Sequence, residues 1–382
     1  MADAGSPAPR GDPETPPGPP TSAPSPAAPI QPAPAGLAGM NPAYFAMVMA
    51  TGIVSIACAL LGLRPLAELL LGLNVLFYVV LCALTGLRLV RHFDQVVSDF
   101  QHHGRSVGFF TTVAATCVLG SQLLDIAGGW ADAWSVAAGL WVVGILLWAG
   151  LTYGIFAMLT VKAVKPTLGE GINGGWLVAV VAAQSVSVLG SKLSPGFGAY
   201  EPHALFFCMV MWLGGGMLYI WITSLIFYRY TFFALSPTDL APPYWINMGA
   251  VAISTLAGTM LIGAAPGSPF LTELLPFLKG FTLLYWSTAT WWIPMLVALG
   301  IWRHGYRRFP LRYDPLYWGA VFPLGMYTAC TYRLAEVIDA PFLSAIPGVF
   351  IYIALAAWLL TLVGLLRSLV RMARARRRRA GT

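Results

Sequence analysis

The sequence predicts an all-α protein that crosses a membrane many times, and three observations lead to this prediction. Only 10% of the 382 residues are charged, whereas soluble domains contain about 25%. Hydrophobic residues make up 58% of the chain, and the mean hydropathy is +0.72. The 55 residues from Val107 to Val161 include only two charged side chains, Asp125 and Asp132. This composition excludes most soluble enzymes and nucleic-acid-binding proteins, because so few charges cannot cover a soluble surface.

Ten apolar runs follow one another after Asn41, and each is long enough to cross a hydrocarbon layer of about 30 Å. The runs are continuous rather than alternating, so they predict helices instead of the strands of a membrane barrel. The connections are short and leave no segment for a soluble domain. In chain order, the expected spans are 43–63, 66–90, 107–127, 134–160, 175–193, 203–228, 244–264, 275–300, 315–338 and 342–366.

The two ends of the chain differ in composition from this membrane domain, which we expect to cover residues 39–366. Residues 1–38 hold twelve prolines mixed with Ala, Ser and Gly, a composition that predicts a disordered cytoplasmic tail. Residues 367–382 form an Arg-rich cytoplasmic tail. Because these arginines follow a membrane helix, they indicate orientation and contact with anionic membrane lipid, and we expect no nucleic-acid partner.

The placement of Lys and Arg predicts that both chain termini are cytoplasmic. Ten crossings put 18 of the 22 basic residues on the side of the Arg-rich tail and leave four on the other side. An odd number of spans would destroy this asymmetry. We therefore expect a multi-pass protein of the cell membrane, inner or plasma. The four outer basic residues are Arg64, Lys192, Lys279 and Arg333.

Small and hydroxylated side chains are more frequent in the odd-numbered spans than in the even-numbered ones. They can serve helix packing, or they can line a polar path through the membrane. Packing alone predicts small residues in both sets, so the bias favours a path, although the eighth span is an exception. Several candidates share one helical face through spacings of three and four. The candidate lining residues are Thr51, Ser55, Thr112, Thr116, Gln184, Ser187, Ser191, Asn247, Ser254 and Thr328.

Three stretches resemble one known family. The first span opens with NPAYFAMVMATGIVS (41–55), the seventh with YWINMG (244–249), and the ninth contains YWGAVFPLGMY (317–327). Together they are similar to the tellurite-resistance/C4-dicarboxylate transporter family. This family includes tellurite-resistance permeases, fungal malate permeases and sulfite efflux pumps, and plant slow-type anion channels. The resemblance covers about 40–366, and the ninth-span motif is the most specific of the three.

The resemblance implies a fold, an assembly and a gate. The fold is ten transmembrane helices arranged as five helical hairpins around a central pore, with the odd-numbered helices inside. The assembly is a homotrimer with one pore in each protomer. The gate is a phenylalanine of the ninth span, which corresponds to Phe322. Pro323 removes a backbone hydrogen bond and predicts a helix kink. A ring at this kink would close a narrow pore by dewetting, whereas ordinary packing is the alternative role for Phe322.

The charged residues bear on the substrate class. Lys192, Arg333 and Glu336 are candidates for an outer vestibule that concentrates anions, although Arg333 and Glu336 can also form a purely structural ion pair. A hydroxyl-lined path passes anions without trapping them. We therefore favour a channel or facilitative exporter of a small anion: an inorganic oxyanion such as sulfite or tellurite, a halide, nitrate or a C4-dicarboxylate. A proton-coupled C4-dicarboxylate (malate) transporter is the alternative, and it would need a buried cation and a titratable carboxylate.

An integral-membrane enzyme without transport activity is the second alternative. All five histidines lie in predicted loops or at span ends, and the sequence contains neither HExxH nor CxxC. We therefore expect no metal site, no cofactor and no enzymatic activity. Asp94 and Asp99 lie close in sequence to Arg88, Arg91 and Arg105, and a solvated cytoplasmic loop accounts for these charges.

Overall fold

The computed structural model describes residues 36–380, and the side chains of this range up to residue 375. The described chain contains helices and connecting turns and no strand, as the sequence predicted. Residues 1–35, which make up nearly all of the predicted N-terminal tail, lie outside this range.

Five short helices form the centre of the bundle. They contact one another in a closed cyclic order, in which the last helix also contacts the first. Their side chains are buried on nearly every face: in an 18-residue apolar stretch of the spans that contain the first, second and fourth, 78%, 89% and 83% of the residues are buried. We call them the inner helices; they are α1 (Ala46–Leu60), α5 (Phe110–Ile126), α8 (Val178–Leu193), α10 (Ile246–Ala264) and α13 (Trp318–Val337).

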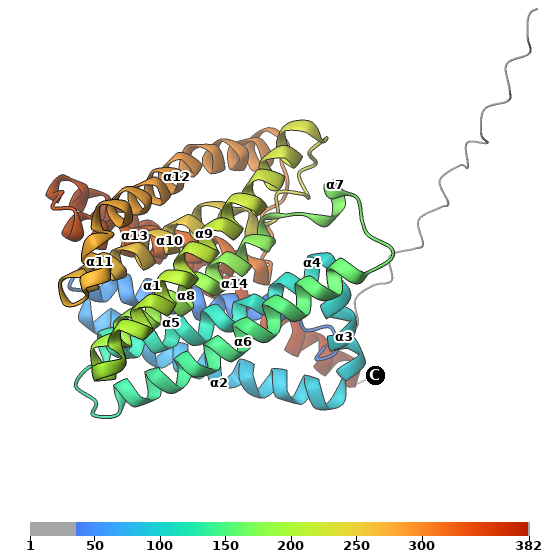
Figure 1. Ribbon diagram of the computed structural model, residues 1–382. Helices are drawn as coiled ribbons and strands as arrows, with labels where there is room; N and C mark the ends of the chain where they lie inside the picture. The colour runs from blue at the N-terminus through green and yellow to red at the C-terminus, as the bar shows by residue number, and fades with distance from the viewer. Residues whose placement is uncertain (1–35, 381–382) are drawn as a thin grey trace, which may run out of the picture. The chain divides into compact units, whose positions relative to one another are not determined.

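Five longer helices cover this centre, and each packs against the inner helix that precedes it in the chain. In four of them only 17–22% of the residues in the corresponding apolar stretch are buried. Their outer faces therefore expose rows of Leu, Val, Ile and Phe side chains that lipid can solvate. In Figure 1, α12 and α2 lie at opposite edges of the bundle and α1 lies between them. We call them the outer helices; they are α2 (Arg64–Arg91), α6 (Ala133–Val161), α9 (Glu201–Phe232), α12 (Leu275–Ile301) and α14 (Ala345–Ala380).

The described chain contains eight helical segments that are long and apolar enough to cross a membrane. One of them, Gly174–Phe232, includes both α8 and α9. These two helices are joined by a 3-10 turn, Ser194–Tyr200, in which Gly198 adopts a φ of 54° that interrupts the helical backbone. Helix α13 is not among the eight segments. These findings confirm the predicted all-helical, multi-pass class, and every predicted apolar run falls on an inner or an outer helix.

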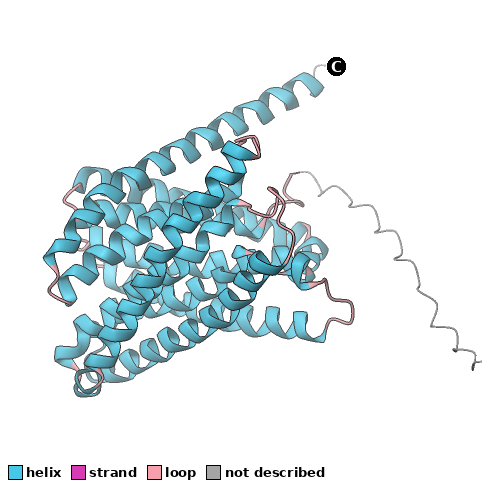
Figure 2. Ribbon diagram, turned by 90° about the horizontal axis from the view of Figure 1, so that it is seen from above, coloured by secondary structure: helices cyan, strands magenta, loops and turns pink. Residues whose placement is uncertain are grey.

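The C-terminal arginines continue an existing helix. Helix α14 runs without a break from Ala345 to Ala380, so the predicted boundary at residue 366 coincides with no end of secondary structure. The last turns of α14 extend beyond the rest of the bundle (Figure 2). The side chains of Arg367, Arg371 and Arg374 are exposed there.

The predicted solvated loop between the second and third spans agrees with the exposure of Arg91 and Asp94, but it is wrong for Asp99. The chain forms a short helix there, α3 (Phe93–Gln101), and Asp99 on this helix is buried with only 7% exposure. Its carboxylate accepts a hydrogen bond from Arg88 Nη2 at 2.6 Å and a second from Arg105 Nε. Both arginines also donate to backbone carbonyls of residues 38–40, just before α1. Burial of these charges is tolerated because each has an opposite charge or a hydrogen-bond partner.

Candidate functional site

Two cavities lie along the inner helices, one at each end of the ring. The first is lined by the C-terminal halves of all five inner helices and has a volume of about 20 Å³. We call it the lysine cavity because Lys192 lies in its wall. Nine of its fourteen lining residues are apolar: Ile53, Ile56, Leu60, Val118, Val188, Ile253, Leu256, Met260 and Met326.

The second cavity lies at the opposite end, where the inner helices begin, and has a volume of about 260 Å³. We call it the glycine cavity because its lining includes Gly104, Gly108, Gly174, Gly175 and Gly319. Each inner helix starts near this cavity with a 3-10 turn. The amide groups at helix N-termini carry partial positive charge, so this end of the ring favours negative ions.

The charged side chains of the glycine cavity are paired or engaged by the backbone. Arg229 Nη2 lies 3.2 Å from Asp239 Oδ1, and Arg229 Nε donates to the carbonyl of Gly169 at 2.6 Å. Burial alone would raise the pKa of Asp239, but hydrogen bonds from Ser236 and the charge of Arg229 outweigh it and hold this pKa below its ordinary value. These contacts join the C-terminal end of α9 to Gly169 in the α6–α8 connection and to Asp239 in the loop after α9.

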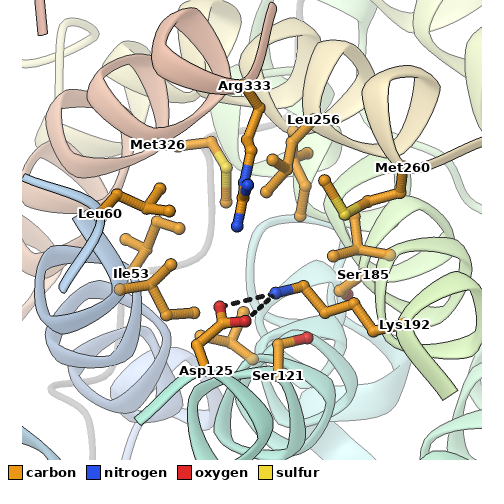
Figure 3. Close-up of a pocket in the computed structure, with 14 residues that line it drawn as sticks. Ile53, Leu60, Ser121, Asp125, Ser185, Lys192, Leu256, Met260, Met326 and Arg333 are labelled. Carbon is orange, nitrogen blue, oxygen red and sulfur yellow. Dashed lines mark hydrogen bonds and ion pairs between the residues drawn. The ribbon is translucent and has the colours of Figure 1, made fainter. Parts of the chain in front are cut away.

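The lysine cavity contains the predicted vestibule residues Lys192 and Arg333 together with an acidic residue that the vestibule prediction did not include. Lys192 Nζ lies 2.6 Å from both carboxylate oxygens of Asp125, and the two side chains are only 13% and 18% exposed. Figure 3 shows the Arg333 guanidinium pointing into the cavity towards this pair. Arg333 Nη1 also donates to Glu336 Oε2 at 3.0 Å, but Glu336 is 47% exposed and does not line the cavity.

Asp125 is the charged lining residue of this cavity that sequence reasoning missed. It is separated from Lys192 by 67 residues, so no local pattern connects the two side chains. A signal was nevertheless present, because Asp125 is an isolated carboxylate inside a long apolar run. An ionisable residue at such a position is expensive to bury and is a candidate for a functional role by default.

The ten predicted lining residues are placed away from both cavities, since none of them belongs to either lining. Four of them connect inner helices to outer helices through hydrogen bonds. Ser55 donates to the carbonyl of Ala67 at 2.7 Å, and Thr51 accepts from Trp358 Nε1 at 3.0 Å. Gln184 and Ser187 on α8 donate to carbonyls of α9 at 2.9 and 2.7 Å.

The other six lie at comparable interfaces or bond to their own helix. Thr116 lies 2.9 Å from the Tyr78 hydroxyl of α2, and it donates to the carbonyl of Thr112. The remaining side chains are Thr112, Asn247, Ser254 and Thr328, which donate to carbonyls three or four residues earlier, and Ser191, which is buried. In this structure nine of the ten side chains therefore form hydrogen bonds within or between packed helices, whereas Ser191 Oγ has no hydrogen-bond partner in the described part of the chain.

The lining residues of the two cavities form one stripe along each inner helix. On α1, Ala46 and Met49 line the glycine cavity, and Ile53, Ile56 and Leu60 line the lysine cavity. Spacings of three and four place these five residues on the same helical face. On the other inner helices, the last residue that lines the glycine cavity and the first that lines the lysine cavity are seven positions apart: Thr111 and Val118, Val178 and Ser185, Ile246 and Ile253, and Gly319 and Met326.

Phe322 lies between the two cavities on this stripe. It is one turn from Gly319, which lines the glycine cavity, and one turn from Met326, which lines the lysine cavity. Its side chain is fully buried, with 0% exposure, and α13 continues through the adjacent Pro323.

Smaller side chains occupy the same level on three of the other inner helices. The two positions midway between the cavities are Ala114 and Ala115 on α5, Val181 and Ala182 on α8, and Gly249 and Ala250 on α10. A Cβ atom at Gly249 would lie 2.7 Å from Pro323 Cγ and 3.4 Å from Phe322 Cδ1. The absence of a side chain at Gly249 therefore makes room for the Phe322–Pro323 segment.

Comparison with known proteins agrees with this architecture. A family model described as SLAC1, voltage-dependent anion channel, matches residues 39–366. An uncharacterized membrane protein of Mycobacterium tuberculosis is 40% identical over 152 residues, which are 40% of this chain and 77% of the relative.

Two fungal relatives match over most of their length. A sulfite efflux pump of Arthroderma benhamiae is 23% identical over 347 residues, 85% of this chain and 89% of the pump. A malic acid transport protein of Schizosaccharomyces pombe is 20% identical over 347 residues, 85% of this chain and 77% of that protein. The family resemblance inferred from the motifs at 41–55, 244–249 and 317–327 is confirmed. The chain belongs to the SLAC1 family of anion channels and transporters, and it is a membrane transport protein rather than an enzyme.

Proposed function

We propose that ten helices of this chain span the membrane as five hairpins and that the inner helices surround an anion pathway. Each hairpin would pair an inner helix with the outer helix that follows it, and the contacts between consecutive helices support this pairing. The apolar exposed faces of the outer helices suit a lipid environment. The protein transports small anions, in keeping with its family.

The proposed pathway runs from the glycine cavity past Phe322 into the lysine cavity. The observation that carries this proposal is that one face of each inner helix lines both cavities. Phe322 lies on this face of α13, between the two cavities, and lines neither of them. By helical register, Ala, Gly and Val occupy this level on three other inner helices, and the ring packs beside Gly249. A hydrophobic constriction of this kind blocks hydrated ions by excluding water, and movement of one side chain would open it.

The orientation and assembly of the protein are part of the same proposal. Both termini would lie in the cytoplasm, so that the glycine cavity opens to the cytoplasm and the lysine cavity to the outside of an inner or plasma membrane. The 18-to-4 distribution of Lys and Arg supports this orientation. Anionic lipid would contact the exposed arginines of α14, and three protomers would form a homotrimer with one pathway in each.

The substrate would be a small anion such as sulfite, tellurite, nitrate, a halide or a C4-dicarboxylate. The sulfite efflux pump among the relatives supports an exported inorganic oxyanion. One specific observation supports the alternative, a proton-coupled malate transporter: Lys192 and Asp125 supply the sheltered cation and carboxylate that such a carrier needs. The malic acid transport protein among the relatives also fits this alternative.

Anion flux into proteoliposomes tests the proposal and separates the two candidates. Purified full-length protein is reconstituted, and the flux of sulfite, nitrate, chloride and malate is measured with and without a pH gradient. A channel or facilitative exporter gives a flux that follows the anion gradient alone. Flux that requires inward protons would select the proton-coupled carrier, and an absence of flux for every anion would refute both.

A further inference from the structure

The lysine cavity contains three charged side chains whose charges do not balance. Lys192 and Arg333 are basic, Asp125 is acidic, and the other eleven lining residues are uncharged. Glu336, which pairs with Arg333, lies outside the lining and is 47% exposed. Solvent screens an exposed pair of this kind strongly. The wall of the cavity therefore carries one positive charge more than it carries negative charges.

The two basic residues approach from different sides of the ring. Lys192 on α8 and Asp125 on α5 belong to helices that contact each other, whereas α13, which holds Arg333, contacts α1 and α10. Figure 3 shows the guanidinium of Arg333 directed across the cavity towards the Lys192–Asp125 pair. An anion between them would therefore meet an ammonium group on one side and a guanidinium group on the other.

The cavity already holds a group that resembles such an anion. The carboxylate of Asp125 is a small oxyanion, and Lys192 Nζ lies 2.6 Å from each of its oxygens. The C-termini of the inner helices lie at this end of the ring, and their partial negative charge opposes anion entry. Lys192 and Arg333 can offset this field, because the wall of the cavity contains only one carboxylate, Asp125, to neutralise them. A guanidinium also binds oxyanions through parallel N–H donors, which a spherical ion uses less well.

We propose that Asp125 is an internal competitor for the transported anion at a binding site formed by Lys192 and Arg333. When no anion is bound, the carboxylate of Asp125 pairs with the ammonium group of Lys192. A small oxyanion with at least two acceptor oxygens displaces this carboxylate and bridges Lys192 and Arg333. The inference rests on the proposed function, and it adds the site, the ligand class and the residue that keeps binding weak enough for release.

Nitrate binding to the full-length protein in detergent tests this inference without any measurement of transport. Nitrate is an oxyanion of constant charge near neutral pH, and ligand binding raises the unfolding temperature in a concentration-dependent way. Asp125→Asn removes the competing charge and keeps the side-chain shape. We expect the half-saturating nitrate concentration to fall about tenfold, the factor that corresponds to 1.4 kcal/mol. Chloride should show a smaller change.

A matched control uses a carboxylate outside the cavity. Glu68 also pairs with a basic residue, Arg64, at 3.1 Å, but its side chain is 58% exposed and does not line the lysine cavity. Glu68→Gln makes the same change in charge and should leave nitrate binding unaltered. Unchanged or weaker nitrate binding by Asp125→Asn would overturn the proposal, as would an equal gain in Glu68→Gln.

Two further variants keep the test decisive if Asp125→Asn alone does not fold. The double variant Asp125→Asn/Lys192→Gln is neutral at both positions, and Arg333→Gln removes the second cation. Both should bind nitrate at least about tenfold more weakly than the original protein, and unchanged affinity in either would refute the site. If these binding results hold but liposomes show no anion flux, the proposed function fails and the binding site stands. If flux is present and nitrate affinity does not change, only the site fails.

Discussion

At residue 322, an aromatic ring lies one turn from a lining residue of each cavity, and the proposed gate predicts a specific effect of its removal. Phe322→Ala should increase basal anion flux, because water can enter the constriction when the ring is absent and the dewetting barrier falls. Preference for anions over cations should remain, since Lys192 and Arg333 are unchanged. The measurement is flux of nitrate and of potassium into proteoliposomes, normalised to the amount of folded protein.

A graded variant distinguishes a gate from a packing residue. Phe322→Leu keeps an apolar side chain and should increase flux less than Phe322→Ala. If Phe322 only packs, its loss leaves a cavity that costs about 3–5 kcal/mol of stability, by analogy with soluble cores. A protein that is less stable and no more conductive would therefore contradict the gate.

At the scale of elements, the close approach of α10 to α13 depends on Gly249. A Cβ atom there would lie 2.7 Å from Pro323 Cγ. Since overpacking of this kind forces neighbouring groups to shift, Gly249→Ala should destabilise the protein by about 1–3 kcal/mol. Gly263→Ala on the same helix is the control, because a Cβ at Gly263 meets nothing within 4 Å. Thermal unfolding in detergent compares the two, and equal stability would contradict the tight α10–α13 contact.

The buried ion pairs of α3 make a second prediction at this scale. Asp99→Asn leaves Arg88, which is 4% exposed, without a negative partner. Breaking a buried charge network in this way should cost about 3–5 kcal/mol. Asp94→Asn is a matched control, since Asp94 is an exposed residue in the first turn of the same helix and its loss should cost less than about 1 kcal/mol. Similar unfolding temperatures for the two variants would show that the Asp99 network contributes little.

For the whole molecule, the charge distribution predicts that both termini are cytoplasmic. Cysteine introduced at Ala4 or at Gly381, in a background without the five native cysteines, should react with a membrane-impermeant reagent only after the cells are permeabilised. The physical reason is that 18 of 22 basic residues lie on the side of the termini when the chain crosses ten times. Labelling of either site in intact cells would exclude ten crossings in this orientation.

The sequence by itself determined the helical, multi-pass class, the approximate bounds of the helices and the family. These properties are encoded locally. A long apolar run must form a helix in lipid, because no water is available for the backbone. The family follows from short contiguous motifs such as 317–327. Residue 322 could be singled out on this basis, although its position between two cavities could not.

Only the tertiary structure decided which face of each inner helix lines a cavity. Soluble helices reveal their buried face through alternation of polar and apolar residues, but the inner helices are buried all round and carry small or apolar residues on every side. Hydroxyl groups such as that of Ser187 were therefore compatible with a pathway or with an interface, and in this structure Ser187 bonds to α9. The Lys192–Asp125 pair was equally inaccessible to sequence reasoning, because two helices far apart in the chain must first pack against each other before these charges can meet.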